Sequence, residues 1–576
     1  MTSYARRPGL TTMIGLAFLI AVCLTTPQMA VAQAAKGEVS PDAPRPVLTY
    51  HGLVPGLDGI AKVREVLGPP ESETRWYDYK LYYPAEGRAG MVDVVHMGDS
   101  SNTSRMQNVD AASVPESYET ETAIREKLGA PEFELRMAAW KLLDYTEKGL
   151  RFGLTPDGKT TGVAYFPHGH ARVPPGERKL IDLSHLRQGP QPAPARPASV
   201  GNLKVGVSEA VISPQSPDWL PDAFTIHDDL KARTAVFTDG NLTVAIVGAD
   251  LFGMGYEEIK VIRDAAKEAG IGHVIFGMSH THSGADTIGV YGYYPEKYVG
   301  FIQQQVIKGI TDAYHNLQAV KGLRAASKEL PMDGMRVMGL IRNARNPGIL
   351  DPTVSVLQAI GEDDKPIATL IHITCHPESL EAGSREISAD YPGYLCDQIK
   401  ADGEGQPVFL NGALGGMVSG DNPERTHESS RETGLKFADI VRELIKTAQS
   451  PATFRFSADQ RVIEIPNTNP RFKELFGTGL RKVVRGKLTT DMIYFQIGEA
   501  QIISLPGELL PEVSFEILEK MDGFPRMLVG LANDELGYMI PAYDFREGFY
   551  EESMSFGPAT ALIVRDAALR MLQGIR

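Results

Sequence analysis

From residue 200 to the end of the chain, short apolar runs alternate with longer amphipathic segments, which limits the possible folds more than any other feature. The runs at 242–247 and 273–278 have the length and β-branched content of buried strands, and 257–269 has apolar residues at helical spacing. Because a sheet or a helix buries its apolar face only against another layer, we expect a mixed α/β layered domain. The other expected elements are a helix at 301–316, strands at 354–359, 367–374, 408–410 and 501–505, and a last helix at 559–572.

The first third of the chain contains two similar segments, 63–71 and 124–132, each with helical spacing, a Leu-Gly stop and a following proline. An aromatic stretch typical of strands follows each segment, at 76–83 and at 140–154. We therefore expect a small α+β domain made of two helix-plus-hairpin repeats, at about 50–110 and 115–170. The repeats resemble those of bacterial envelope proteins, including outer-membrane assembly lipoproteins, which implies that they bind an unknown envelope partner.

The first residues are typical of an export signal. Arg6 and Arg7 precede an apolar run at 13–24, and Ala30-Val31-Ala32 matches a small-x-small cleavage site. The apolar run is too short to span a bilayer as a helix, and no later segment is long enough, so we expect no stable membrane insertion. The predicted organisation is a signal peptide at 1–32, the repeat domain at 45–185, a Pro/Ala-rich linker at 186–200 and a large C-terminal domain at 201–576.

The composition excludes some classes of partner. The formal net charge is -14, and loss of Arg6 and Arg7 with the signal would make it more negative. This balance argues against binding nucleic acid and against a basic membrane-docking face. Cys375 and Cys396 would be the cysteines of the mature protein, and both a disulfide and two buried thiols are compatible with an exported chain.

The clearest candidate for chemistry is Ser279-His280-Thr281-His282-Ser283-Gly284, directly after the apolar run 273–278. Two residues apart on an extended chain, both imidazoles point to one face. The end of a strand places them where α/β proteins usually bind ligands. A pair of histidines that only completes the core or the surface is the structural alternative.

Three further candidates lie at other predicted strand ends. His376 ends an apolar strand and precedes Pro377, although His372 shares its strand face. Glu508 lies in a Pro-Gly-Glu turn, where an acidic residue in the first turn of a helix is the alternative interpretation. Tyr538 follows the unusual run at 530–535.

These residue types match a catalytic zinc site. Two histidines, one carboxylate and one open or weakly held position describe catalytic zinc rather than a closed structural site. Zinc held in this way lowers the pKa of a bound water to about 7 and polarises a carbonyl oxygen. Spacing alone does not bring four distant segments together, so the cofactor Zn²⁺ is predicted here from residue types.

In this order, the four segments resemble the neutral/alkaline ceramidase family over about residues 200–576. The family carries a Thr-His-Thr-His-Ser-Gly segment, a strand ending in His-Pro, a Pro-Gly-Glu turn and a late tyrosine block. The resemblance implies a hydrolase of linear amides that acts in lipid and sphingolipid metabolism. It implies that zinc is bound by His280, His376, Glu508 and Tyr538, and that His282, Tyr550 and Arg342 contact the substrate amide or the developing oxyanion. Arg345 competes with Arg342 for the last role.

The chain departs from this family in two places. The family's Gly-Asp-Val-Ser-Pro-Asn segment is Gly416-Met417-Val418-Ser419-Gly420-Asp421 here, which keeps Ser419 but loses the aspartate and the proline. Ser419 is then either a covalent nucleophile or a small residue in a turn. The family's C-terminal immunoglobulin-like domain has no counterpart in the sequence, so we expect weak action on ceramide in membranes.

The sequence therefore predicts an exported, periplasmic or secreted zinc hydrolase that cleaves an N-acyl amide of ceramide type with zinc-activated water. The alternatives are a covalent mechanism through Ser419, and a zinc hydrolase of esters or cell-wall amides. A different class of protein, a non-catalytic envelope binding or scaffold protein, is also compatible with the repeats.

Overall fold

In the computed structural model, the described residues are 48–574 without the segments 76–77, 87–90, 100–105, 107, 167–177, 187–196, 221–223, 291–293, 381–384, 422–423, 473–481 and 547–548. The predicted signal peptide at 1–32 and most of the predicted linker at 186–200 lie outside them.

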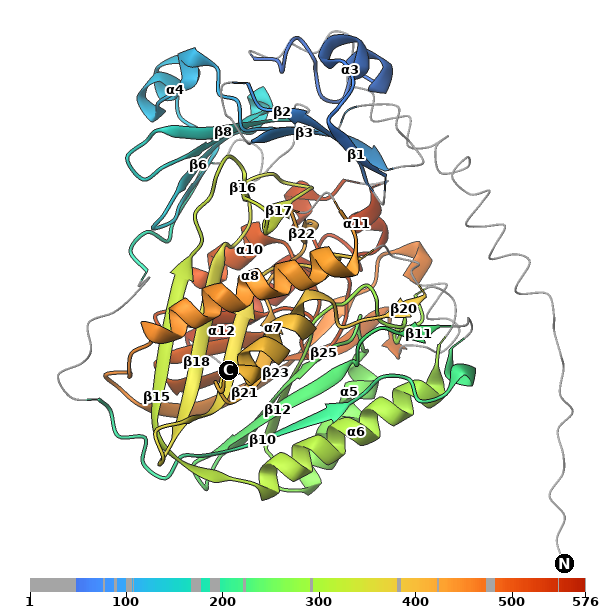
Figure 1. The fold of residues 1–576 in the computed structure, drawn as a ribbon, viewed down its shortest axis with the longest axis vertical. Helices are drawn as coiled ribbons and strands as arrows, with labels where there is room; N and C mark the ends of the chain where they lie inside the picture. Colours follow the sequence, from blue (N-terminus) through green and yellow to red (C-terminus); the bar gives the residue numbers. More distant parts are fainter. Residues whose placement is uncertain are drawn as a thin grey trace, which may run out of the picture. The chain divides into compact units, whose positions relative to one another are not determined.

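An eight-stranded mixed sheet forms the centre of the C-terminal two thirds (Figure 1). Its strands, in spatial order, are β14 (His273–Met278), β13 (Thr243–Ala249), β12 (Lys231–Thr238), β10 (Lys204–Val211), β15 (Gln318–Glu329), β18 (Thr353–Gly361), β19 (Pro366–Ile373) and β21 (Gln406–Asn411). Neighbours are antiparallel except β13–β14 and β19–β21, which are parallel. Each parallel pair is joined by a helix, α5 (Tyr256–Glu268) or α7 (Asp390–Ala401), since a parallel connection needs a crossover.

A second sheet of five strands packs against the first. It contains β23 (Arg455–Pro466), β25 (Lys487–Gly498), β26 (Ala500–Ser504) and β28 (Arg526–Val529) in that order, with β24 (Val483–Val484) beside β25. The side chains of a strand alternate between its two faces. Accordingly, Ile246 on β13 joins Phe495 on β25 in the core between the sheets, whereas Val247 belongs to the core under the helices.

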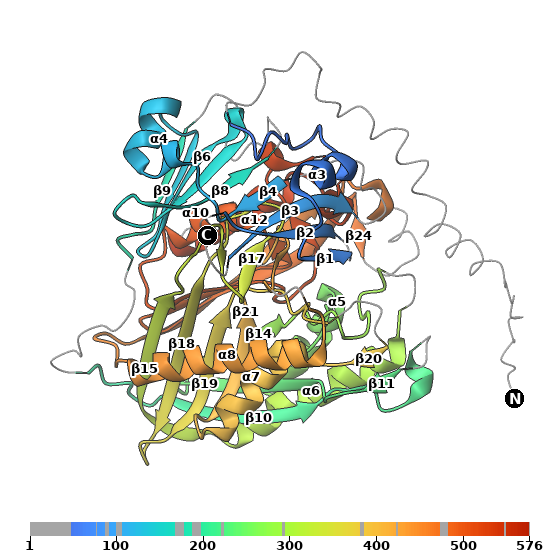
Figure 2. The same ribbon diagram turned by 45° about the horizontal axis from the view of Figure 1, so that its top comes forward.

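Helices cover the outer faces of both sheets. α5, α6 (Glu296–His315), α7 and α8 (His427–Lys446) share a core with the eight-stranded sheet, and Figures 1 and 2 show α7 and α8 over β15, β18 and β21. On the other side, α10 (Pro511–Leu518) and α12 (Thr560–Leu572) pack on the five-stranded sheet. The order of layers is helix, sheet, sheet, helix, which confirms the predicted mixed α/β fold.

The smaller elements connect these layers. They are β11 (Thr225–Ile226) paired with β20 (Glu386–Ile387); β16 (Arg336–Val337), β17 (Ile341–Asn343) and β22 (Val418–Ser419) in one sheet; β27 (Glu508–Leu509) paired with β29 (Tyr538–Met539); and the short helix α11 (Tyr550–Ser553). The 3-10 helices are η1 (Glu116–Tyr118), η2 (Thr146–Lys148), η3 (Pro217–Trp219) and η4 (Ala542–Asp544).

The N-terminal region folds around one nine-stranded sheet. Its helices are α3 (Ile60–Leu67) and α4 (Glu121–Leu128), and its strands in chain order are β1 (Ser72–Arg75), β2 (Asp78–Pro84), β3 (Val92–Asp99), β4 (Asn108–Ala111), β5 (Phe133–Arg136), β6 (Lys141–Tyr145), β7 (Leu150–Leu154), β8 (Thr160–Tyr165) and β9 (Lys179–Asp182). α3 is followed by four strands and α4 by five, rather than each by one hairpin, and pairing of β4 with β8 joins both sets. The assignment of these sets as repeats, and the domain boundaries, stay predictions.

Direct contacts join this region to the rest of the described chain. The Glu329 carboxylate accepts hydrogen bonds from the backbone N–H groups of Ala138 and Ala139, and the buried Arg151 donates to the Pro347 carbonyl. Trp140 belongs to the same hydrophobic cluster as residues of α10 and α12. The N-terminal sheet is therefore anchored to the surface of the layered body.

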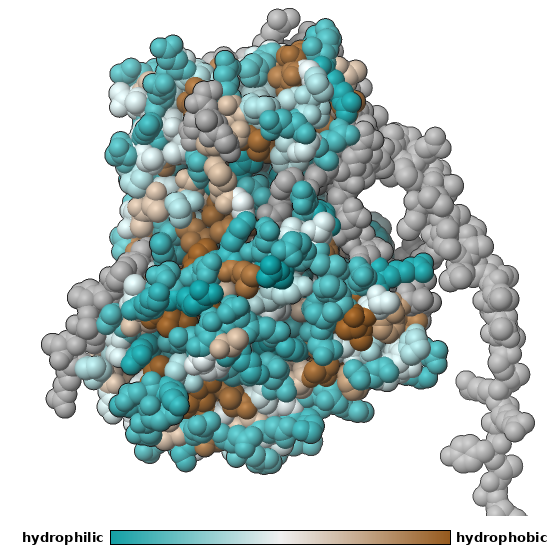
Figure 3. Space-filling model, in the orientation of Figure 1, coloured by the Kyte–Doolittle hydropathy of each residue, from teal (hydrophilic) through white to brown (hydrophobic). Residues whose placement is uncertain are grey.

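Cys375 and Cys396 are both buried free thiols, so the structure contains no bridge between them. Burial raises the pKa of the Cys396 thiol to about 12, and a protonated thiol is unreactive. Within the described part of the chain, no helix has the length and apolar character needed to cross a bilayer. The face in Figure 3 is mostly hydrophilic, with hydrophobic residues in separate small patches.

Gly248 tests how closely the eight-stranded sheet packs. A Cβ there would collide with the Phe409 carbonyl of β21 and lie 3.1 Å from a methyl carbon of Val408. We expect Gly248→Ala to lower the free energy of unfolding by about 1–3 kcal/mol, as overpacking of a core does. Gly322→Ala on β15 is the matched control, because its Cβ would meet nothing within 4 Å. Urea unfolding of both variants checks this, and equal midpoints would contradict the close approach.

Candidate metal centre and active site

Asn411, the last residue of β21, connects the ends of three strands. Its side-chain N–H₂ donates to the Ser279 carbonyl at 2.8 Å and to the Cys375 carbonyl at 3.0 Å. Its oxygen accepts from the backbone N–H of Cys375 at 3.2 Å and of Gly412 at 3.0 Å. An amide side chain has two donor hydrogens and an acceptor oxygen with two lone pairs, so this buried group is fully used. The residues after Ser279 and Cys375, namely His280 and His376, are thereby held close together.

His280 and His282 follow β14 in a tight turn. His280 has φ 68°, a left-handed conformation. The two histidines therefore do not lie on an extended strand, in contrast to the expectation from the sequence. Its Nδ1–H donates to the Phe252 carbonyl at 2.6 Å, and the Phe252 ring stacks on the imidazole at 4.9 Å. Burial lowers the pKa of His280 to about 3, so its ring is neutral near pH 7. Its Nε2 therefore presents a lone pair to the site.

His376 is fixed in the same way. Its Nδ1–H donates to the Val418 carbonyl at 2.9 Å, which leaves Nε2 directed to Glu508 Oε2 at 2.9 Å. His372, the alternative on the same strand, instead bonds through Nε2 to the Leu528 carbonyl and is a packed histidine. Burial opposes protonation of His376, but its hydrogen bond to Glu508 and the charges of Glu378 and Glu508 together outweigh this and raise its pKa above the ordinary value.

Glu508 and Tyr538 are placed by one strand pairing. β27 and β29 are parallel, with Glu508 directly opposite Tyr538. Glu508 therefore lies in a short strand, and α10 begins only at Pro511, so the helix-dipole interpretation of this residue is wrong. Gly507, with φ 136°, allows the turn before it. Burial, then the charge of Glu508, raise the pKa of Tyr538 well above its ordinary value, and its hydroxyl donates to Met417 Sδ at 3.2 Å.

The donor atoms converge in a way that suits a metal ion. Ligand atoms of His280, His282 and His376 lie within 4.8 Å of one another, and His280 Nε2 is 3.7 Å from Glu508 Oε1. The Nε2 lone pair of His376 meets a carboxylate, so a proton or a metal cation must lie between them. Neutral imidazoles whose Nδ1–H groups bind carbonyls are oriented as in known metal sites. Nitrogen and carboxylate donors of this kind fit zinc.

The structure places Tyr550 at the edge of this group. Its side chain is 41% exposed at the start of α11, and its ring is 6.1 Å from that of Tyr538. Arg345 is buried below α11, where it forms ion pairs with Glu551, with Glu552 at 2.7 Å and with Asp544 at 3.3 Å. Arg345 therefore holds the helix that carries Tyr550.

Arg342 and Ser419 lie on the small sheet beside His376. They are opposite each other in the pairing of β17 with β22, and Ser419 also forms a parallel bridge with His376. Both side chains are nearly buried, and neither is among the residues described as lining the pocket. The structure thus brings them next to one histidine without placing them at the pocket wall.

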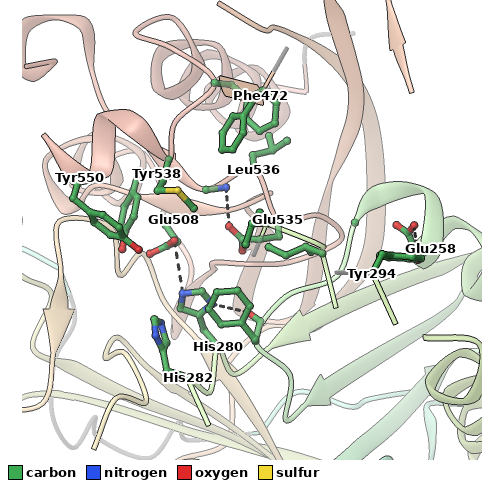
Figure 4. Close-up of a pocket in the computed structure, with 17 residues that line it drawn as sticks. Glu258, His280, His282, Tyr294, Phe472, Glu508, Glu535, Leu536, Tyr538 and Tyr550 are labelled. Carbon is green, nitrogen blue, oxygen red and sulfur yellow. Dashed lines mark hydrogen bonds and ion pairs between the residues drawn. The ribbon is translucent and has the colours of Figure 1, made fainter. Parts of the chain in front are cut away.

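A pocket of about 730 Å³, counting solvent at its mouth, opens on the metal-site residues. Figure 4 shows His280, His282, Glu508, Tyr538 and Tyr550 gathered on one side, with Glu258 and Tyr294 across from them. The apolar part of the wall comes from Phe252, Ile288, Val290, Phe472, Leu536 and Phe556. The arrangement offers donors for a metal beside an apolar surface.

Sequence reasoning missed three residues here. Asn411 arranges the strand ends, Phe252 supports His280, and the buried carboxylate of Glu378 lies 3.4 Å from His282 Nε2. The only local signal was position, since Asn411 ends an apolar run and Glu378 follows His376-Pro377.

Comparison with solved structures identifies the fold. A neutral ceramidase from Pseudomonas aeruginosa superimposes with a TM-score of 0.53 at 17% identity, over 65% of this chain and 75% of that one. A ceramidase complexed with C2 gives a TM-score of 0.53 at 16% identity, over 65% and 76% of the two chains. No family model and no curated protein matches the chain.

The chain therefore has a layered α/β fold of the neutral ceramidase type. This confirms the resemblance drawn from the four sequence segments. The individual site residues stay predictions, which the following variants test.

We expect the purified protein to contain about one zinc ion per chain, and His376→Ala and Glu508→Ala to remain folded but lose it. Removing a ligand should weaken zinc binding by more than the roughly 10–100-fold loss seen for residues that only orient a ligand. Metal analysis of dialysed protein measures this. His372→Gln is the matched control, since His372 bonds the Leu528 carbonyl rather than the site and a glutamine amide is also a donor. Full zinc content in both ligand variants would show that the ligands are wrong.

Proposed function

We propose that the protein is an exported zinc-dependent hydrolase that cleaves the amide bond of an N-acyl, ceramide-like substrate. The observation that carries the proposal is the convergence of His280, His282 and Glu508 at the pocket wall, with His376 in contact with Glu508. The fold shared with neutral ceramidases supports the same class of reaction.

In this proposal His280, His376, Glu508 and Tyr538 hold zinc. Bound there, zinc would supply Lewis acidity and lower the pKa of a bound water. The carbonyl partners of both Nδ1 atoms keep the two rings in the tautomer that zinc requires. Tyr538 would have to turn away from Met417 to take part, since its hydroxyl donates to that sulfur.

The pocket wall supports an apolar acyl group in the substrate. The ring centres of Phe472 and Phe556 lie 4.9 Å apart, and the Phe252 ring contacts the rings of both His280 and His282. Burial of methylene groups against such surfaces contributes about 0.8 kcal/mol each. Phe549 and Tyr550 add exposed aromatic surface at α11.

The remaining residues would orient the amide. Burial keeps the pKa of His282 well below its ordinary value, so a neutral ring can donate or accept one hydrogen bond. Tyr550, at the exposed edge of the same side of the pocket, would donate to the developing oxyanion. Arg342, which pairs with Ser419 one strand away from His376 and does not line the pocket, would have to move to contact the amide.

Two alternatives use the same residues. A hydrolase of esters or cell-wall amides needs the same metal and differs in the shape of the pocket. The alternative of a non-catalytic scaffold protein would depend on the N-terminal region, which would bind an envelope partner.

The central test is hydrolysis of a panel of substrates, containing soluble short-chain N-acyl amides, detergent-solubilised ceramide and ceramide in vesicles. We expect zinc-dependent amide cleavage that a chelator and His376→Ala abolish. Tyr550→Phe should lower kcat by about 10²–10³-fold, the effect of losing one oxyanion donor. If zinc is bound but no amide is cleaved, the ester or cell-wall alternative replaces this proposal.

Ser419→Ala separates attack by water from covalent catalysis. If water attacks, turnover should stay within about a hundredfold of the unmodified protein, since only a neighbouring polar group is lost. The exposed Ser457→Ala on β23 is the control. A loss of several further orders of magnitude, or an acyl group trapped on Ser419 and detected by mass spectrometry, would favour the covalent route.

A further inference from the structure

Glu378 presents a buried carboxylate to the active site, and the proposed chemistry does not account for it. The side chain is 3% exposed, and that of His282 is 9% exposed. Glu378 Oε1 and His282 Nε2 lie 3.4 Å apart, and among the described residues neither atom has a hydrogen-bond partner. Two buried polar atoms left unpartnered at this distance indicate that each completes the other's hydrogen bonding, because an unmade bond is costly in the interior.

The backbone holds the two side chains together. His282 N–H donates to the Pro377 carbonyl at 3.1 Å, which joins the turn after β14 to the turn after β19. The Glu378 N–H donates to the His376 carbonyl, and Arg425 donates to the Glu378 carbonyl at 3.0 Å. The main chain on both sides is therefore fixed, with the two side-chain atoms 3.4 Å apart.

The charge of Glu378 is directed to the site rather than neutralised by a structural cation. Arg425 contacts its main-chain oxygen, and within the described ranges no ion pair joins its carboxylate to a lysine or an arginine. The carboxylate is close enough for its charge to act on both His376 and Tyr538. A carboxylate that only supported the fold would more often be paired with a cation or with backbone N–H groups.

We propose that Glu378 is a positioning residue of the active site: its Oε1 accepts a hydrogen bond from His282 Nε2–H. This bond would select one tautomer and one ring orientation, and it would leave Nδ1 as the acceptor of the ring. A carboxylate behind an imidazole is a known means of fixing the tautomer that a reaction needs. The role of Glu378 in catalysis rests on the proposed function of His282, whereas the hydrogen bond between the two side chains can exist without that function.

The kinetic test compares Glu378→Ala with Glu378→Gln in the zinc-loaded protein. We expect Glu378→Ala to lower kcat for a soluble N-acyl amide by about 10–100-fold, with KM nearly unchanged, as for residues that orient a ligand or catalytic ring. Glu378→Gln keeps an acceptor oxygen and should recover most of the loss. Glu386→Gln, on an exposed residue nearby in the chain, is the control that should behave as the unmodified protein. Equal kcat in the unmodified and Glu378→Ala proteins would overturn the proposal.

The second readout does not depend on activity. In protein with ¹⁵N-labelled histidine, the signals of His282, assigned by their loss in His282→Gln, should show the single Nε2–H tautomer. They should become a mixture of tautomers in Glu378→Ala, while zinc content stays the same. An unchanged tautomer in Glu378→Ala would refute the pairing, and loss of zinc would make Glu378 a ligand instead. If no amide is hydrolysed at all, the proposed function fails while this measurement still decides the pairing.

Discussion

The hydrogen bonds of Asn411 are the interaction on which the site depends. This one buried amide joins the ends of β14, β19 and β21 through Ser279, Cys375 and Gly412. His280 and His376 are the next residues after two of those contacts, so a shift of Asn411 would move both. Replacement of such a group leaves several backbone donors and acceptors unpaired in the core, each at a cost of about 1–3 kcal/mol.

The packing of the two sheets supplies the other half of the site. Glu508 and Tyr538 lie in the short strands β27 and β29, which follow β26 and β28 of the five-stranded sheet. They reach the histidines only because that sheet is buried against the eight-stranded one. The run at 530–535 completes the join, since Met278 N–H donates to the Leu531 carbonyl and Asn533 N–H to the Phe276 carbonyl. The metal-site residues therefore belong to two sheets that must pack correctly before any metal can bind.

Local patterns predicted nine elements of the layered body, eight of them to within two residues at each end, but gave no expectation for β10, β12, β15, β23, β25, α7 or α8. β14 was expected at 273–278 and lies there, and α5 and β18 differ by one or two residues from expectation. The errors occur where several segments cooperate. Residues 140–154 form the two strands β6 and β7, separated by η2, and Glu508 pairs with the distant strand β29. Such pairing between distant segments produces no hydrophobic periodicity within one segment, so local patterns do not reveal it.

The sequence by itself determined the alternation of strands and helices, the residue types suited to zinc, and their positions at strand ends. These follow from burial and chain chemistry, which act within one segment. The tertiary structure alone decided that Arg345 holds α11 and that Glu378 lies next to His282. Such choices depend on which buried polar groups meet across packed layers, and that is set by the free energy of the whole fold.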